Sequence, residues 1–328
     1  MPFATCLANE LISHLNETPG LETVTAAGSL RRGRETVGDL DLLASCSNGA
    51  AVLDQFLRFP RVHEVLGRGE NKASALVGVE KIQVDVRALP RESYGALQYF
   101  SGSKEHNVAL RQRPSGSVHL ERVWPLPSGW SERVAGETEE GIYSTLGLAW
   151  IPPEMREYAG ELELAETDSL PLLVEARQIR GDLHMHTRET DGRATLEEMA
   201  AECGQLGYEY IAITDHSKAL AMANGLDETR AVAFAQEVRE HNRAGMPLRV
   251  FSGLECDILR EGEMDLTTDA LSELEIVIGS VHSYMNLEPA EMTDRLMKAL
   301  QCPALKVLGH LTGRLLLHRE GYKFDFDL

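Results

Sequence analysis

The sequence predicts an α/β protein of more than one domain. Stretches in which apolar residues alternate are followed by stretches with helical spacing of apolar residues, and this alternation becomes regular after residue 179. A length of 328 residues exceeds what one core of ordinary size holds, so two or three domains are expected. A hydrophobic content of 43% and a charged content of 25% are typical of globular proteins.

Composition narrows the class of protein. No apolar run reaches the roughly 18 residues that a membrane-spanning helix needs, and the start lacks the basic and apolar regions of a secretory signal. The five cysteines show no C-x-x-C spacing, so we expect reduced thiols in a cytoplasmic protein. The net charge of −19 lies entirely after residue 115, since residues 1–115 carry equal numbers of basic and acidic side chains. DNA binding by that first part is therefore allowed but not required.

The first hundred residues alternate between helix and strand patterns. Apolar positions at helical spacing predict a helix over 4–18, which ends at a Pro-Gly pair. The further predicted elements are strands over 21–27, 39–43, 62–66, 74–78 and 81–87, and helices over 50–59, 93–100 and 103–113, the last beginning at a serine cap. This order is typical of a mixed sheet covered by helices.

Two carboxylates project from one face of the strand over 39–43. Asp39 and Asp41 are two residues apart, so they share a face while the intervening leucines face the other way. Their mutual repulsion predicts a bound divalent cation, and Mg²⁺ is the one that best suits oxygen ligands. Asp85, on the strand over 81–87, is a candidate third ligand. The alternative is an exposed strand with solvated acids, which the arginines and the Gly28-Ser29 pair just upstream make less attractive because they suggest a phosphate cradle.

The middle of the chain has weaker signals. Residues 114–129 are rich in Pro, Ser and Gly, which predicts a loop or a domain edge. A small helix and a turn are expected within 131–150, followed by an acidic connector over 151–169.

After residue 179 five short apolar runs each end at a potential metal ligand. The runs are 179–183, 210–214, 248–254, 276–281 and 306–309, and helices are predicted between them over 195–206, 228–243 and 289–300. Functional groups at the carboxyl ends of successive strands are typical of a βα barrel whose site lies on that rim. Each histidine alone is more simply explained as a core or surface residue. Several at one rim, together with carboxylates, predict Zn²⁺, Mn²⁺ or Fe²⁺, with a glutamate able to bridge two ions.

These motifs resemble two known families. Gly28-Ser29 to Asp41, Val84-Asp85-Val86-Arg87 and Tyr99-Phe100-Ser101-Gly102-Ser103 resemble the palm of the family X DNA polymerases. Gly181-Asp182-Leu183-His184-Met185-His186-Thr187 and Thr214-Asp215-His216-Ser217 resemble the PHP (polymerase and histidinol phosphatase) domain. In this order they resemble the bacterial and archaeal family X polymerases that end in a PHP domain. The resemblance implies a nucleotidyltransferase palm over 1–115, a small α+β thumb with the acidic connector over 116–178, and an incomplete βα barrel-like PHP domain over 179–328.

The resemblance also implies roles for single residues in the front half. Asp39, Asp41 and Asp85 would hold two Mg²⁺ or Mn²⁺ ions for transfer of a nucleotide from a dNTP to a primer 3′-hydroxyl. The implied nucleotide-binding residues are Gly28, Ser29, Arg32 and Gly38 for the phosphates, Tyr99, Phe100 and Gly102 for the sugar, Asn107 for the base, and Lys104, which replaces an acid of the beta-type enzyme. Arg111 would touch the template strand. Taken alone, Tyr99 and Phe100 are explained equally well by packing at a helix end.

For the rear half the resemblance implies a metal cluster and a hydrolytic activity. The implied ligands of Zn²⁺ or Mn²⁺ are His184, His186, Asp191, His216, Glu255, His282 and His310. Such a cluster would activate water for 3′-5′ exonuclease or 3′-phosphatase chemistry. The implied partners are gapped or primer-template DNA and dNTPs, with no membrane, and the expected state is a monomer.

The ends of the chain also depart from the family pattern. Members of this kind begin with a lyase-like domain and end with an Asp-x-His pair, and neither is present here, so the resemblance implies a chain truncated at both ends, with weak insertion and an impaired nuclease. Two alternatives of other classes are a metal-dependent phosphoesterase whose front half only binds nucleotide, and a non-catalytic remnant.

Overall fold

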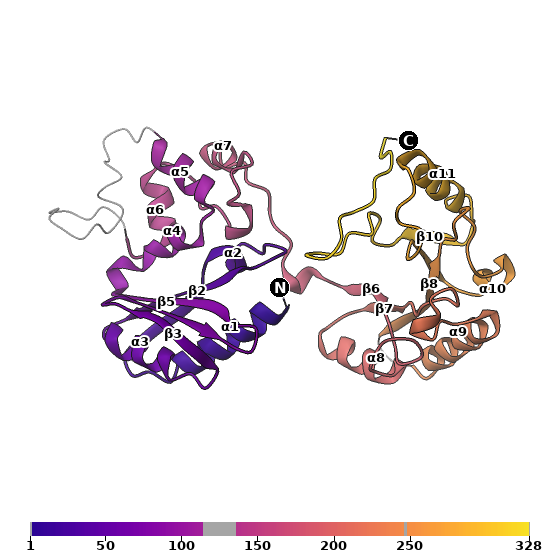
Figure 1. Ribbon diagram of the computed structural model, residues 1–328, viewed down its shortest axis with the longest axis horizontal. Coiled ribbons are helices and arrows are strands. Elements are labelled where there is room, and N and C mark those ends of the chain that lie inside the picture. The colour runs from indigo at the N-terminus through magenta and orange to yellow at the C-terminus, as the bar shows by residue number, and fades with distance from the viewer. Residues whose placement is uncertain (1, 114–135, 246–247, 328) are drawn as a thin grey trace. The chain divides into compact units, whose positions relative to one another are not determined.

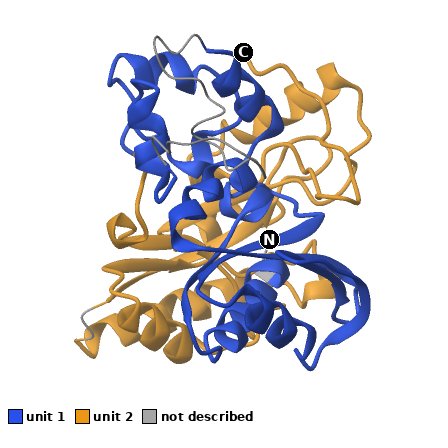
Figure 2. Cartoon of the chain, turned by 90° about the vertical axis from the view of Figure 1, so that its left-hand side faces the viewer, with its two compact units in different colours: residues 1–172 blue, residues 173–328 orange. Residues whose placement is uncertain are grey.

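The computed structural model describes residues 2–113, 136–245 and 248–327. The chain divides into two compact units, residues 1–172 and 173–328, which Figure 2 distinguishes by colour. The loop predicted over 114–129 and the first part of the segment 131–150 lie outside the described residues. The predicted boundary between palm and thumb at 115/116 stays a prediction.

The first unit is built on a five-stranded mixed sheet with the order β1-β2-β5-β4-β3. The strands are β1 (Leu21–Ala26), β2 (Asp39–Cys46), β3 (Val62–Arg68), β4 (Lys72–Val77) and β5 (Ile82–Leu89). β2 and β5 run parallel, and the other neighbouring pairs are antiparallel. This confirms the predicted α/β fold class with a mixed sheet in the front half.

Period-two alternation gives the sheet two different faces. Leu40, Leu42, Val84 and Val86 lie on one face and are buried with leucines and Phe56 of the helices that cover it. These helices are α1 (Pro2–Leu15) and α3 (Gly49–Leu57) (Figure 1). The opposite face of β2 and β5 carries Asp41 and Asp85, together with Leu43, which packs in a small apolar cluster. It meets the one-turn helix α2 (Gly28–Arg31), the 3-10 helix η1 (Arg91–Ala96) and α4 (Leu97–Ser101).

The rest of the first unit is helical and has a core of its own. The helices are α5 (Lys104–Gln112), α6 (Glu139–Thr145), the 3-10 helix η3 (Pro153–Met155) and α7 (Glu161–Glu166). Leu110, Tyr143, Ile151 and Leu162 are buried together in this core. The prediction of an acidic connector over 151–169 was therefore wrong for most of that range. The acidic residues of this range made it look like a solvent-exposed connector. Leu162 and Ala165, however, lie three residues apart on one side of α7 and are buried in the core.

The second unit is a parallel sheet with the order β10-β9-β8-β7-β6. The strands are β6 (Gly181–Met185), β7 (Tyr210–Ile213), β8 (Arg249–Asp257), β9 (Ile276–Ser280) and β10 (Leu305–Leu308). The five predicted strands are all present, and β6 and β10 are the edges of this sheet, so it does not close into a barrel within the described residues. β8 continues past the expected end of its apolar run, so it includes the first carboxylates that follow.

Helices connect these parallel strands. They are α8 (Leu196–Gln205), the 3-10 helix η5 (Ala221–Ala223), α9 (Glu228–Arg243), α10 (Thr268–Ser272) and α11 (Pro289–Ala299), and a further 3-10 helix, η4 (Ala176–Gln178), precedes β6. Thr195 and Glu198 form a capping box at the start of α8, each accepting a hydrogen bond from the other's backbone N–H. Among the described residues, no helix is long and apolar enough to cross a bilayer.

Candidate active sites

The parallel pairing of β2 with β5 brings the front carboxylates together. Asp41 lies opposite Asp85 in this register, and Asp39 lies two residues before Asp41 on the same face. Burial of the Asp41 carboxylate, with the negative charges of Asp39 and Asp85 beside it, raises the pKa of Asp41 to about 6. A site of oxygen donors in which negative charges repel one another fits a hard divalent cation such as Mg²⁺.

Asp85 is held differently from Asp41, by a cation and by neutral donors. Nζ of Lys72, on β4, lies 2.5 Å from Oδ2 of Asp85, and Nε2 of Gln83 donates to Oδ1 at 3.3 Å. Burial alone would raise the pKa of Asp85, but the hydrogen bonds from Lys72 and Ser74 lower it below its ordinary value. These hydrogen bonds favour the ionised carboxylate, although Asp85 is only 8% exposed.

The turn between β1 and β2 touches this carboxylate group. Gly28 has φ +61°, and a Cβ at this position would lie 2.7 Å from Oδ2 of Asp41. Only glycine fits both the conformation and the space, so the backbone can approach the acidic site closely here. Ser29 follows within the one-turn helix α2, which the sequence did not predict, while Gly38 has open space around it.

Arg31 and Arg32, which follow the Gly28-Ser29 pair, form ion pairs with glutamates from a later part of the same unit. Arg31 makes a two-pronged ion pair with Glu139, both bonds being 2.7 Å, and Arg156 binds the same carboxylate at 2.7 Å. Nε of Arg32 donates to Glu157 at 2.8 Å, and its Nη1 donates to the carbonyl of Ser101. Arg32, predicted to bind phosphate, thus lies against the turn that contains Gly102.

Glu139 provides a test of this cluster in acid. Burial alone would raise its pKa, but the hydrogen bonds from Arg31 and Arg156 lower it from 4.5 to about 2. A depressed pKa gives stability that is present above the unfolded value and is lost as the pH falls from about 4.5 to about 2. Glu139→Gln is therefore expected to lower the free energy of unfolding at pH 7 by about 3 kcal/mol. Urea unfolding at pH 7 and at pH 3 measures this. If wild type and Glu139→Gln lost equal amounts of stability between pH 7 and pH 3, the proposed contribution of the ionised Glu139 would be contradicted.

The predicted sugar and base contacts are gathered around α4 and α5. The rings of Tyr99 and Phe100 pack edge to face with centroids 5.3 Å apart, and Tyr99 is 40% exposed. The guanidinium of Arg111 lies 5.5 Å from the Tyr99 ring, and its Nε donates to the Asn107 carbonyl. Asn107 is only 5% exposed, and its Nδ2 donates to the Tyr99 carbonyl at 2.8 Å. Lys104 is exposed at the start of α5.

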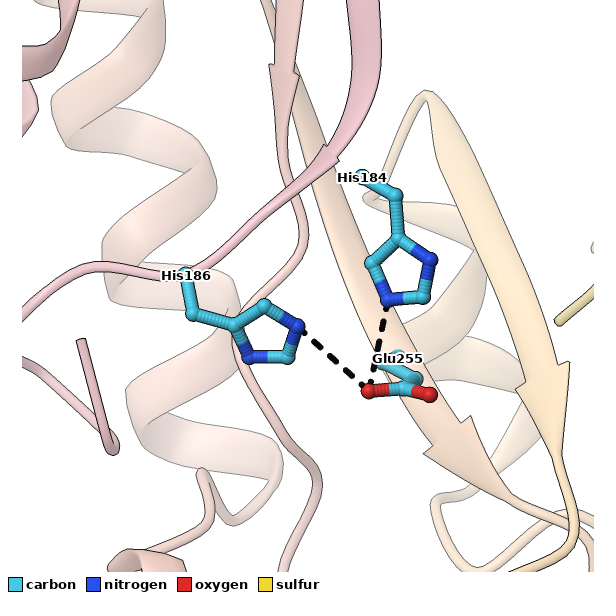
Figure 3. Close-up of side chains that lie close together, drawn as sticks. All are labelled: His184, His186 and Glu255. Carbon is cyan, nitrogen blue, oxygen red and sulfur yellow. Dashed lines mark ion pairs between the residues drawn. The ribbon is translucent and has the colours of Figure 1, made fainter. Parts of the chain in front are cut away.

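In the second unit one buried carboxylate is surrounded by imidazoles. Glu255, on β8, is 2% exposed, and its two oxygens together face five histidines. Oε2 lies 3.1–3.5 Å from ring nitrogens of three of them, and Oε1 lies 2.8 and 3.3 Å from those of the other two. These histidines are His184, His186, His216, His282 and His310. Figure 3 shows His184 and His186 pointing at the same carboxylate oxygen.

The seventh predicted ligand, Asp191, lies beside two of these rings. Its oxygens are 3.3 Å from Nδ1 of His186 and 3.4 Å from Nε2 of His216. Among the described residues, the groups whose ligand atoms all lie within 4.8 Å of one another belong to this unit. They are His184 with His186 and Glu255, His186 with Asp191 and His216, and His216 with Glu255 and His282. The front carboxylates are not among these groups.

The nitrogen and oxygen atoms of this centre are better arranged to coordinate metal ions than to hydrogen-bond with one another. Nδ1 of His186 and Nδ1 of His216 are buried and have no hydrogen-bond partner. Each nevertheless lies within 3.3 Å of a carboxylate oxygen. A cation between such a nitrogen and such an oxygen would bind both, and mixed imidazole and carboxylate donors suit Zn²⁺ or Mn²⁺.

Charge in this centre is distributed unevenly. Burial alone would raise the pKa of Glu255, but hydrogen bonds from His184, His282 and His310 hold it well below its usual range. Burial lowers the pKa of His216. For His282 burial acts in the same direction, but the carboxylates of Asp257 and Glu255 raise its pKa to about 9.

Sequence reasoning missed Asp257, which lies behind one of the predicted ligands. Oδ1 of Asp257 lies 3.1 Å from Nδ1 of His282 and orients that ring from behind. The signal was available, because Asp257 follows Glu255 by two residues on the same strand. Asp215 is fully buried and accepts hydrogen bonds from Thr187 and Thr190. It therefore fixes the loop after β6.

Comparisons with known proteins match both units. The PHP domain family matches residues 182–324, and the DNA polymerase beta thumb family matches residues 126–157. A relative described as "DNA polymerase/3'-5' exonuclease PolX", from Bacillus subtilis, is 38% identical over 333 residues, which cover 99% of this chain and 57% of that protein. A probable phosphatase from Caldicellulosiruptor saccharolyticus is 32% identical over 39% of this chain and 53% of its own length. One from Syntrophotalea carbinolica is 24% identical over the same shares. This chain thus spans little more than half the length of these relatives.

Proposed function

Because this chain belongs to the family X DNA polymerases that carry a PHP domain, we propose that its first unit fills gaps in DNA by adding nucleotides to a primer 3′-hydroxyl. The observation that carries this proposal is the register of β2 with β5, which sets Asp39, Asp41 and Asp85 on one face beside the Gly28 turn. We further propose that the second unit hydrolyses phosphodiesters as a 3′-5′ exonuclease or phosphoesterase.

In the first unit, Asp39, Asp41 and Asp85 would hold two Mg²⁺ or Mn²⁺ ions. Ions bound there would lower the pKa of the primer hydroxyl and neutralise charge on the departing pyrophosphate. Gly28, Ser29 and Gly38 offer backbone N–H groups and a hydroxyl to the phosphates, and Arg32 offers its guanidinium. The exposed ring of Tyr99 and the adjacent Phe100 would pack against the sugar.

In the second unit, the five histidines with Glu255 and Asp191 would hold Zn²⁺ or Mn²⁺. Ions bound there would supply an activated water at neutral pH. Glu255 faces several rings at once, which suits a bridging ligand, and Asp257 would keep Nε2 of His282 directed at the centre. Names of relatives support both chemistries, since one is described as a polymerase and exonuclease and others as probable phosphatases.

We propose gapped or primer-template DNA and dNTPs as partners, a monomeric state and a place in the cytoplasm. The balanced charge of residues 1–115 is compatible with DNA in that part of the chain. The five cysteines are free thiols in the structure, which is compatible with a reducing compartment.

Incorporation of one labelled dNTP into DNA with a one-nucleotide gap tests the proposal. We expect template-directed incorporation that requires Mg²⁺ or Mn²⁺ and that stops when the ions are chelated. Release of nucleoside monophosphates from the 3′ end of labelled single-stranded DNA tests the second activity in the same preparation. Hydrolysis without any incorporation would support the alternative in which the front half only binds nucleotide.

A further inference from the structure

A chain of buried polar side chains runs from α7 to the predicted base contact. Glu161 Oε1 lies 2.6 Å from Nδ1 of His106, and Nε2 of His106 lies 2.9 Å from the hydroxyl of Tyr143. Nε2 of Gln98 lies 3.4 Å from the same hydroxyl and donates to Oδ1 of Asn107 at 3.1 Å. Gln98, His106 and Tyr143 are fully buried. The chain therefore links four helices within the first unit.

The proton positions along this chain are determined by its Glu161 end. The carboxylate of Glu161 accepts hydrogen bonds from the backbone N–H groups of Tyr158 and Ala159, at 2.9 and 2.6 Å. Burial lowers the pKa of His106, which favours the neutral imidazole, and the Glu161 carboxylate 2.6 Å from Nδ1 can only accept a hydrogen bond. Its single proton then lies on Nδ1, where it is donated to Glu161, and Nε2 accepts from the Tyr143 hydroxyl.

The same logic orients the amide of Asn107. Because the Tyr143 hydroxyl donates to His106, its oxygen can accept from the Gln98 amide. That amide also donates to Oδ1 of Asn107, while Nδ2 of Asn107 donates to the Tyr99 carbonyl. The oxygen and the nitrogen of the Asn107 amide are therefore assigned. One Nδ2 hydrogen remains for an acceptor outside this row of hydrogen-bonded side chains.

We propose that Gln98 is a positioning residue: held by Tyr143 and His106, it fixes the Asn107 amide so that its second Nδ2 hydrogen meets an acceptor on the incoming base. This inference rests on the proposed polymerase function. It predicts that Gln98 sets the KM for dNTP through Asn107 and contributes nothing to the chemical step.

Stability alone does not account for these residues. They lie next to a core of leucines and isoleucines, where apolar side chains would pack without any hydrogen bonds. Oε1 of Gln98 is buried without a hydrogen-bond partner, which lowers the stability of the fold. These buried polar side chains lower the stability of the fold, but they hold the Asn107 amide in one orientation.

A double-mutant cycle on gapped DNA tests the proposal. Gln98→Leu is expected to raise the KM for the correct dNTP about tenfold, the effect of one lost hydrogen bond, with kcat unchanged. In an Asn107→Ala background the same change is expected to have no further effect on KM. Tyr143→Phe, which removes only the hydroxyl, should raise KM in the same direction. Ser144→Ala is the matched control, because Ser144 is exposed on the same helix and bonds only locally.

A second readout does not depend on activity. In protein labelled with ¹⁵N-asparagine, the side-chain amide signals of Asn107 are expected to move toward solvent-averaged positions in Gln98→Leu but not in Ser144→Ala. An equal KM effect of Gln98→Leu with and without Asn107 would overturn the proposal, as would unchanged Asn107 amide signals. If wild type inserted no nucleotide, the proposed function would fail, and the amide signals would still decide whether Gln98 positions Asn107.

Discussion

Replacing Asp41 with asparagine is expected to lower the rate of nucleotide insertion by at least about a thousandfold. Asp41 lies between Asp39 on its own strand and Asp85 on the neighbouring one. A neutral amide there removes the central carboxylate of the proposed site for two metal ions. Rapid-quench measurement of one insertion into gapped DNA, at saturating dNTP and Mg²⁺, provides the rate.

The stability of this variant separates loss of chemistry from loss of fold. Because the fold raises the pKa of Asp41 from 3.8 to about 6, the metal-free protein loses stability as the pH rises between these two values, and the loss is complete at pH 7.5. Asp41→Asn is therefore expected to melt no earlier than wild type at pH 7.5. Asp54→Asn, which changes an exposed acid on α3, is the matched control and should insert at the wild-type rate. Insertion by Asp41→Asn within threefold of wild type would refute the assignment.

Replacing Glu255 with glutamine is expected to remove metal binding and hydrolysis from the second unit. The carboxylate faces five imidazoles, and no other residue in the three groups of closely spaced candidate ligands is as deeply buried. Since loss of an outer partner of a metal ligand already costs about 10–100-fold in affinity, loss of this ligand should cost more than about a hundredfold. Titration with Mn²⁺, followed by calorimetry, measures the affinity.

Glu263→Gln is the matched control for this experiment. Glu263 is an exposed glutamate of the same unit that pairs with Lys298, so its replacement should leave both metal affinity and hydrolysis unchanged. Retention of wild-type Mn²⁺ affinity by Glu255→Gln would show that the imidazoles bind metal without it, and the bridging role would be wrong.

Local periodicity was enough to predict most elements and several site residues. The alternation around Asp39, Asp41 and Asp85 depends only on residues one and two positions away, so it is readable from sequence. The same is true of the histidines that follow apolar strands, and of the Thr195 cap. What these patterns could not give is which strands are neighbours. Asp41 meets Asp85 only because β5 lies next to β2.

The parts that sequence reasoning missed depend on long-range contacts between polar residues. His106 meets Glu161 across 55 positions, and Gln98 meets Tyr143 across 45. No periodic pattern encodes such a pair, because hydrogen bonds depend on tertiary placement. The packing of residues 151–166 was hidden for the same reason, since the partner of the acidic Glu161 is a distant histidine.

The central claim is that two metal centres, one in each unit, perform two separate reactions. The most direct measurement assays nucleotide insertion and 3′-end hydrolysis side by side in wild type, Asp41→Asn and Glu255→Gln. We predict that Asp41→Asn loses insertion and keeps hydrolysis, and that Glu255→Gln does the reverse. Loss of both activities in either folded variant, or insertion by Asp41→Asn at the wild-type rate, would contradict the account.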